Sequence, residues 1–125
     1  MLNNKSLQAI LAIGPLVLFT LCFFSYFFFF FSIFMNIEQL ENSNQPPTAF
    51  FAGMGIFFMV FFFAMILSLL SLIYFVIHAA KNPNLEEGSI RVVWILIIVL
   101  VSGIGNLIYW IAEIKLKNPK PVIPD

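Results

Sequence analysis

Charged side chains are scarce in this sequence. Asp, Glu, Lys and Arg make up 10% of its 125 residues, whereas 62% are hydrophobic. A water-soluble domain carries about 25% charged residues, which keep its surface hydrated. The six basic and six acidic residues also cancel, so no overall charge attracts nucleic acid. The deficit indicates that the lipid bilayer surrounds most of the chain, and we expect no nucleic-acid partner.

The residues that carry most enzyme chemistry are almost missing. Cys22, His78 and Asp125 are the single representatives of their types, and Asp125 is the last residue. One histidine and one cysteine cannot complete a zinc site, which needs four ligands. A Ser-His-Asp triad lacks a usable acid, and no GxxxxGK[ST] phosphate loop is present. We therefore predict a protein without catalytic residues, metal or cofactor.

Three stretches lack Asp, Glu, Lys and Arg over lengths that can cross a membrane. They run from Ser6 to Ile37, from Asn42 to Ala80 and from Val92 to Ala112. About 20 apolar residues at 1.5 Å each span the hydrocarbon core, and short loops force neighbouring helices to be antiparallel. We predict a single all-α integral membrane domain, 1–125, with three antiparallel transmembrane helices at about 7–36, 49–80 and 90–116 and a tail at 117–125. The localisation would be multi-pass in a cell membrane.

Pro15 lies inside the first apolar stretch. A proline removes one helical hydrogen bond, so either the helix kinks there or the span begins at Pro15, with residues 1–14 along the interface. The apolar stretch is about twice as long as that of a cleaved signal peptide, so we expect it to remain as a helix.

The distribution of basic residues does not decide the orientation. Three straight spans divide the cations equally, with Lys5, Lys81 and Arg91 on one side and Lys115, Lys117 and Lys120 on the other. The first loop contains two glutamates and no cation, which favours an external position for it. We therefore predict a cytoplasmic N-terminus and an external C-terminus.

A re-entrant hairpin folding at 103–105 is the alternative for the third helix, and it would place all six cations on one side. Two tryptophans favour the full span. Trp94 and Trp110 are 16 residues apart, about 24 Å along a helix, which would put one ring near each interface. We predict a full span with Trp94, Tyr109 and Trp110 as interfacial anchors.

Small and polar residues gather in the middle of the third helix, at Ser102, Gly103, Gly105 and Asn106. Glycines weaken a helix but let another backbone approach closely. An unpaired amide is costly in lipid, so Asn106 must bond a neighbour. We predict a helix contact at these four residues, either with a partner protein or with helix one or two of the same chain, and we favour the latter.

Two ionisable residues lie near the ends of the predicted spans. We expect His78, beside Lys81, to sit at the interface with its ring in the headgroup region, and a pH-sensing or ligand role is the alternative. Glu113 and Lys117 are spaced as an ordinary exposed helix ion pair.

The segment from Arg91 to Trp110 reads RVVWILIIVLVSGIGNLIYW. It resembles the membrane segment at the N-terminus of phospholipase D-type enzymes, which has an early Trp, a central Gly and a later Tyr. With the preceding Lys-Asn loop, residues 77–110 also resemble small multi-span proteins of low-GC Gram-positive bacteria, some near bacteriocin or transporter genes. The enzymes' His-x-Lys-x4-Asp signature is absent, because His78-Ala-Ala-Lys81 has the wrong spacing and no Asp follows. The resemblance implies a shared membrane anchor without the chemistry.

These observations favour a non-enzymatic bacterial membrane protein that contacts a membrane protein or peptide laterally. Self-protection against a membrane-active peptide is one form, and an accessory subunit of a transporter is another. A small oligomeric transporter or pore is the alternative, although it would need a polar face on each helix. A lipid-modifying enzyme is disfavoured by the missing His and Asp set.

Overall fold

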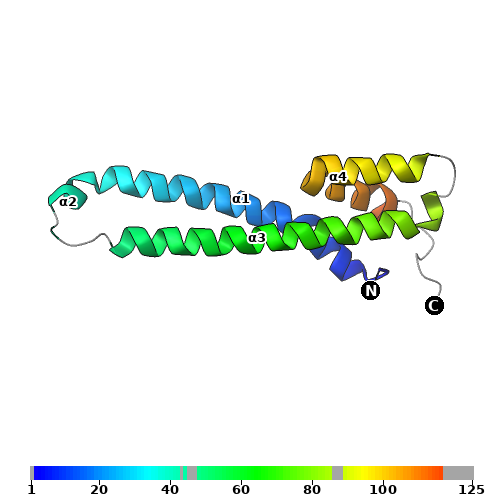
Figure 1. Cartoon of the computed structure of the whole chain (residues 1–125), viewed down its shortest axis with the longest axis horizontal. Helices are drawn as coiled ribbons and strands as arrows, with labels where there is room; N and C mark the ends of the chain where they lie inside the picture. The colour runs from blue at the N-terminus through cyan, green and yellow to red at the C-terminus, as the bar shows by residue number, and fades with distance from the viewer. Residues whose placement is uncertain (1, 43, 45–47, 86–88, 117–125) are drawn as a thin grey trace. The chain divides into compact units, whose positions relative to one another are not determined.

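The protein is helical throughout the part that the computed structural model describes, which is residues 2–42, 44, 48–85 and 89–116 (Figure 1). The long helices are α1 (Lys5–Met35), α3 (Thr48–Lys81) and α4 (Ile90–Tyr109). Short elements are α2 (Ile37–Asn42), the 3-10 turn η1 (Pro83–Leu85) and η2 (Trp110–Lys115), a π-helical continuation of α4. Three segments are long and apolar enough to cross a membrane: Lys5–Met35, Phe50–Lys81 and Ile90–Lys115. The predicted all-α class with three such segments is confirmed.

The chain divides into two compact units. Unit 1 comprises Met1–Leu16 and Met65–Asp125, and unit 2 comprises Val17–Ala64. Helices α1 and α3 each contribute residues to both units.

In unit 2, α1 and α3 pair through aromatic rings. Three pairs of rings join the two helices, and the distances are between ring centroids. They are 6.4 Å for Phe19 and Phe61, 6.2 Å for Tyr26 and Phe57, and 5.3 Å for Phe29 and Phe50. Residue numbers rise along α1 as they fall along α3, so the two helices run antiparallel here. Of the described side chains in unit 2, Cys22 and Ala64 alone are buried.

Unit 1 holds the interior of the protein. Its buried apolar side chains come from α1, α3, η1 and α4, and they are Leu11, Ala12, Phe75, Ala79, Leu85, Ile98 and Tyr109. Helix α1 continues through Pro15, which is itself buried, so the helix neither begins nor ends at this residue.

Helix α4 doubles back on itself. Ser102 has φ 44° and ψ −115°, outside the helical region, and Figure 1 shows the two arms, residues 90–101 and 103–116, side by side. The rings of Trp94 and Tyr109 lie 5.4 Å apart, whereas a straight helix would separate these residues by about 22 Å. The predicted straight third span is therefore wrong, and the structure adopts the hairpin alternative.

Gly105 makes the hairpin possible. A Cβ atom on Gly105 would lie 2.5 Å from the carbonyl oxygen of Ile97 and 3.1 Å from the Cα atom of Ile98. The second arm therefore presses on the backbone of the first, which a side chain would prevent. The aromatic spacing also fits, because Trp94 and Trp110 are equidistant from Ser102 in sequence. They would mark the same depth on the two arms of a hairpin rather than opposite interfaces.

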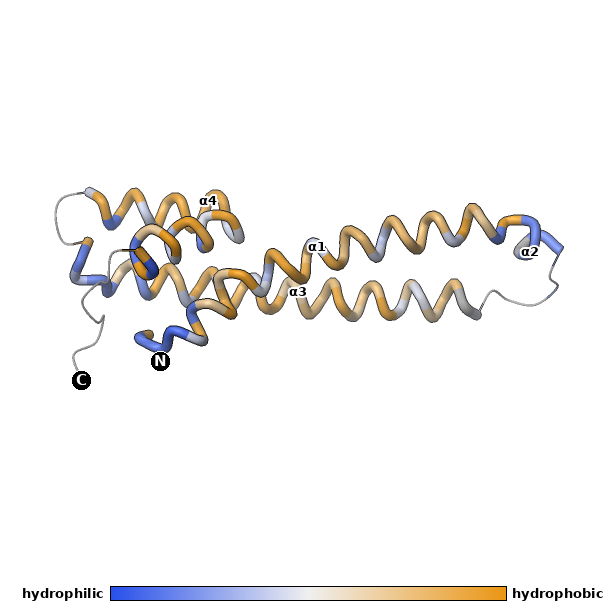
Figure 2. The backbone as a smooth tube through the Cα atoms, turned by 180° about the vertical axis from the view of Figure 1, so that it is seen from behind, coloured by the Kyte–Doolittle hydropathy of each residue, from blue (hydrophilic) through white to orange (hydrophobic). Residues whose placement is uncertain are grey.

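The hairpin returns the chain to the end at which α4 begins. Figure 2 shows hydrophilic residues of unit 1 at that end, near the N-terminus, after α3 and in η2. At 1.5 Å per residue the arms measure about 18 and 21 Å, too short to cross a core of about 30 Å. This geometry removes the tie among the described cations, because Lys5, Lys81, Arg91 and Lys115 then belong to the same side; Lys117 and Lys120 lie outside the described residues.

We accordingly expect both termini on the cytoplasmic side, in place of the external C-terminus predicted above. Single cysteines can be introduced as Asn3→Cys, Asn44→Cys and Asp125→Cys in a Cys22→Ala background and treated with a membrane-impermeant maleimide. Positions 3 and 125 should be protected in intact cells and react after permeabilisation, while position 44 reacts at once. Labelling of position 125 together with position 44 would restore the full span.

Candidate functional site

A chain of buried hydrogen bonds links the three long helices of unit 1, and Pro15 explains where it starts. The carbonyl of Leu11 lacks its helical donor because Pro15, four residues later, has no N–H. The hydroxyl of Ser71 on α3 donates to this carbonyl at 2.6 Å, and the amide of Asn106 donates to the same hydroxyl at 2.9 Å. A backbone defect in α1 is thus repaired by α3, which in turn binds the second arm of α4.

Asn106 has the hydrogen-bond partner that an amide in the middle of an apolar segment needs. It is 1% exposed, and its amide nitrogen has a partner inside the chain, whereas Oδ1 has none among the described residues. Gly103 also faces the chain's own helices, since a Cβ there would lie 3.5 Å from Leu16 Cδ2 in ordinary contact. Gly103 and Asn106 therefore contact α1 and α3, as the favoured interpretation expects, whereas Gly105 packs against Ile97 of α4 itself, which that interpretation did not include.

A second set of buried polar groups surrounds Tyr109. Its hydroxyl lies 2.8 Å from Nδ1 of His78 and accepts from the amide of Asn82 at 3.0 Å. The other ring nitrogen of His78, Nε2, lies 3.4 Å from Nε2 of Gln8. All four residues are at most 4% exposed. We call Gln8, His78, Asn82 and Tyr109 the polar cluster; α1, α3 and the second arm of α4 meet there, with Asn82 directly after α3.

The contacts of Gln8 favour one tautomer of His78. The Gln8 amide nitrogen donates to the carbonyl of Leu2 at 2.6 Å, and this bond fixes the orientation of the amide, because a carbonyl can only accept. The remaining amide hydrogen can be donated to Nε2 of His78, 3.4 Å away, and on this basis we predict the tautomer in which Nδ1–H donates to the oxygen of Tyr109. In that tautomer Tyr109 accepts two hydrogen bonds in the interior. The expectation that His78 extends to the headgroup region is wrong, because the ring is enclosed by the chain itself.

Residues after α3 form hydrogen bonds with Asn82, a member of the polar cluster. The side-chain oxygen of Asn82 accepts from the backbone and the side chain of Asn84, at 3.0 and 2.7 Å. Arg91, at the start of α4, donates to the backbone carbonyl of Asn82 at 3.2 Å. These contacts fix the entry into α4 and so position the first arm of the hairpin.

The aromatic residues predicted as interfacial anchors have different environments. Tyr109 is fully buried, so the prediction that it anchors at the interface is wrong. Trp94 packs against Tyr109, and Trp110 lies under the ammonium of Lys115, 5.4 Å from the ring centroid. Glu113 is also buried, at 3% exposure, so the expected exposed ion pair is wrong for this carboxylate; Lys117 lies outside the described residues.

Three members of these networks, Gln8, Ser71 and Asn82, were not singled out from the sequence. Each is a polar residue in or next to an apolar span, which is a signal in itself, because an amide or hydroxyl in lipid needs a partner. Spacing alone could not pair them, since their partners lie 27 to 70 residues away.

No family model, curated protein or solved structure matches this chain. The resemblance of its third apolar segment to phospholipase D-type membrane anchors therefore remains a hypothesis.

The chemical capacity of the described residues is narrow. Both ring nitrogens of His78 have partners inside the chain, and Cys22 is buried in the other unit. Within the described part of the chain, no three His, Cys, Asp or Glu side chains are grouped so that they could hold a metal ion. The polar groups thus serve mainly to hold α1, α3 and α4 together.

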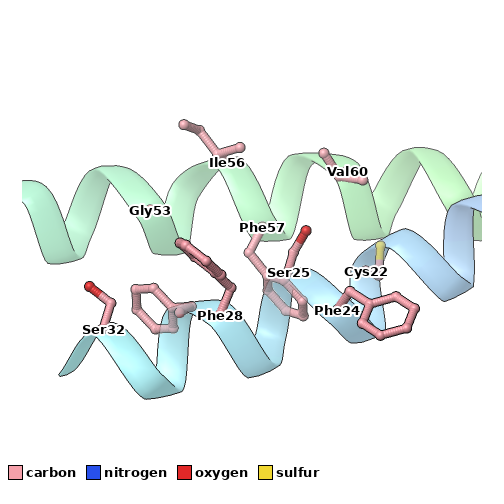
Figure 3. A pocket seen from close by; sticks show the side chains of 10 residues that line it. Cys22, Phe24, Ser25, Phe28, Ser32, Gly53, Ile56, Phe57 and Val60 are labelled. Atoms are coloured by element: carbon pink, nitrogen blue, oxygen red, sulfur yellow. The ribbon is translucent and has the colours of Figure 1, made fainter. Parts of the chain in front are cut away.

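A groove of about 470 Å³ lies between α1 and α3 within unit 2 (Figure 3). Its lining on α1 extends from Cys22 to Ser32 and on α3 from Gly53 to Val60. Figure 3 shows Cys22 and Ser25 directed from α1 toward α3, and Phe57 directed from α3 toward α1. Phenylalanine rings form much of its wall: Phe24, Phe28, Phe29 and Phe57.

We expect the effects of Pro15→Ala and Ser71→Ala on stability to be coupled. Ser71→Ala removes the donor to Leu11 and the acceptor of Asn106, which should cost about 1–2 kcal/mol. In a Pro15→Ala background the new N–H satisfies Leu11, so the same substitution should cost about 1 kcal/mol less. The four proteins of this cycle can be compared by unfolding in mixed micelles with increasing dodecyl sulfate. Additive effects would show that the proline does not explain the bond between Ser71 and Leu11.

Proposed function

We propose that the chain is a non-enzymatic integral protein of a bacterial cell membrane that acts by lateral contact with another membrane-embedded protein or peptide. The observation that carries the proposal is the separation of polar from apolar groups. The buried polar side chains of unit 1 bond largely to one another, whereas the helices of both units expose large apolar side chains. Contact between apolar surfaces is the activity that such a surface supports.

The distribution of polar groups also bears on the pore alternative. A pore formed by several copies needs polar side chains on an outward face of each helix. Here Ser71, His78 and Asn106 are buried and bonded within one chain. The geometry therefore favours the contact protein over the pore.

Self-protection against a membrane-active peptide and a subunit role in a transporter are the two forms of this proposal. The likeness of the third segment to small proteins of Gram-positive bacteria, some near bacteriocin or transporter genes, supports both. In either form unit 2 would provide the contact surface and unit 1 the anchor.

The proposal can be tested in cells and in detergent. Deleting the gene should sensitise cells to at least one peptide of a broad membrane-active panel, or else impair a transporter whose subunit co-purifies in stoichiometric amount in mild detergent. Complementation with the wild-type chain should reverse the change. Unchanged sensitivity, together with a homo-oligomer as the sole species in the pull-down, would contradict the proposal and favour the pore.

A further inference from the structure

The groove of unit 2 runs along the helices rather than across them. Its α1 wall covers ten residue steps, from Cys22 to Ser32, which corresponds to about 15 Å along a helix. This is about the depth of one leaflet, half of a hydrocarbon core of about 30 Å. The lining of the groove thus extends along the helices by about the depth of one leaflet.

The lining identifies an apolar occupant. Phenylalanine, isoleucine and valine side chains dominate it, and the hydroxyls of Ser25 and Ser32 are its main polar groups. A serine hydroxyl in a helix can bond a preceding carbonyl of the same helix, so it need not hold a ligand. A trapped water needs two to four polar partners, which such a wall does not supply.

A transmembrane helix is a poor fit to this groove. Helices associate in lipid where small residues let the backbones approach. The small residue here is Gly53, and the ring of Phe29 covers it, since a Cβ on Gly53 would lie 3.2 Å from that ring. Large rings around it, such as Phe28 and Phe57, would hold a helix about 10 Å in diameter away from the floor. A lipid acyl chain is a single file of methylene groups, and it can bind without a close approach of two helix backbones.

The groove lies in the apolar segments of the chain, where the surrounding molecules would be membrane lipids. Residues 17–35 and 48–64 contain no Asp, Glu, Lys or Arg, and both belong to segments that are apolar and long enough to cross a membrane. We propose that the unit 2 groove is a binding site for one acyl chain of a membrane phospholipid. Dispersion contacts with the fixed aromatic wall hold the chain, because dehydration gives no gain inside a bilayer. This inference does not depend on the proposed function, and each can fail alone.

The test uses the full chain in nanodiscs of phosphatidylcholine that contain a small fraction of the same lipid with a photoreactive diazirine in its acyl chain. After irradiation, labelled positions are mapped by mass spectrometry. Labels should concentrate on groove residues such as Ser25 and Val60 and saturate as the probe fraction rises. Outward side chains of the same helices, such as Phe31 and Phe62, should show weaker labelling that does not saturate.

Two glycines provide a matched pair of variants. Gly53→Leu adds a side chain that meets the ring of Phe29 in the groove wall, and should lower the labelling of the groove about fivefold by displacing that ring into the space of the lipid chain. Gly55→Leu adds the same side chain where nothing lies within 4 Å and should leave the labelling unchanged. Circular dichroism and size exclusion establish that each variant folds, and Val60→Phe replaces Gly53→Leu if that variant does not. Uniform labelling of all exposed residues, or equal labelling of the groove in both variants, would overturn the inference.

Discussion

Replacing Gly105 with alanine is expected to open the hairpin of α4. The added Cβ would meet the Ile97 carbonyl oxygen at 2.5 Å, and backbone atoms cannot move aside as a flexible side chain can. Forcing the arms apart should cost about 3 kcal/mol, while alanine favours a continuous helix by about 1 kcal/mol over glycine. Both effects act against the folded hairpin.

The opening can be measured as a distance. Spin labels at Ile90 and Leu116, both exposed, can be introduced in a Cys22→Ala background, because Cys22 is the single cysteine. In the hairpin the two arms lie side by side (Figure 1), so the labels should be much closer than in a straight helix, which would separate these positions by about 39 Å. Gly105→Ala should shift the distance distribution toward the long value and lower the stability in a dodecyl sulfate titration.

Gly103→Ala is the matched control for this experiment. Its Cβ would lie 3.5 Å from Leu16 Cδ2, an ordinary contact, so the stability should change by no more than about 0.5 kcal/mol. Equal behaviour of the two alanine variants would show that the close approach at Gly105 does not determine the hairpin.

Replacing Tyr109 with phenylalanine is expected to destabilise unit 1 by about 2 kcal/mol. The ring and its packing against Phe75 and Trp94 are retained, but the hydroxyl that accepts from His78 and Asn82 is lost. The side chains of His78 and Asn82 then lose this hydrogen-bond partner, and an unpaired buried group costs about 1–3 kcal/mol. The measurement is again unfolding in mixed micelles.

Tyr26→Phe serves as the control for Tyr109→Phe, because it removes the same atom from a ring that is 51% exposed. It should change the stability by at most about 0.5 kcal/mol. A second readout comes from the ¹⁵N spectrum of His78, in which the proton should reside on Nδ1 in the wild type. A stability loss no greater than that of Tyr26→Phe, or a proton on Nε2, would refute the polar cluster as described.

Asn106 and Tyr109 show which features can be predicted from the neighbouring sequence and which cannot. An amide far inside an apolar stretch must find a partner, so the buried bond of Asn106 was predictable in kind. The identity of the partner was not, because Ser71 lies 35 residues away. Tyr109 carries an amphipathic ring next to Trp110, and that pattern is typical of an interfacial residue. In the structure Tyr109 is instead buried against His78, so it is not an interfacial residue.

The first loop gives a smaller example. The sequence predicts a polar loop between the first two spans, and within it Ile37–Asn42 forms the short helix α2. The difference is local and does not affect the site.

The sequence by itself determined the helical class, the number of long apolar segments and the scarcity of ionisable residues, because these depend on composition and on lengths along the chain. The tertiary structure alone decided that the third segment turns at Ser102. Trp94 and Trp110 are equally spaced around this residue, so their separation suits a straight span and a hairpin alike. What distinguishes the two is the approach of Gly105 to Ile97 and of Tyr109 to His78. Such contacts exist only after the chain has folded.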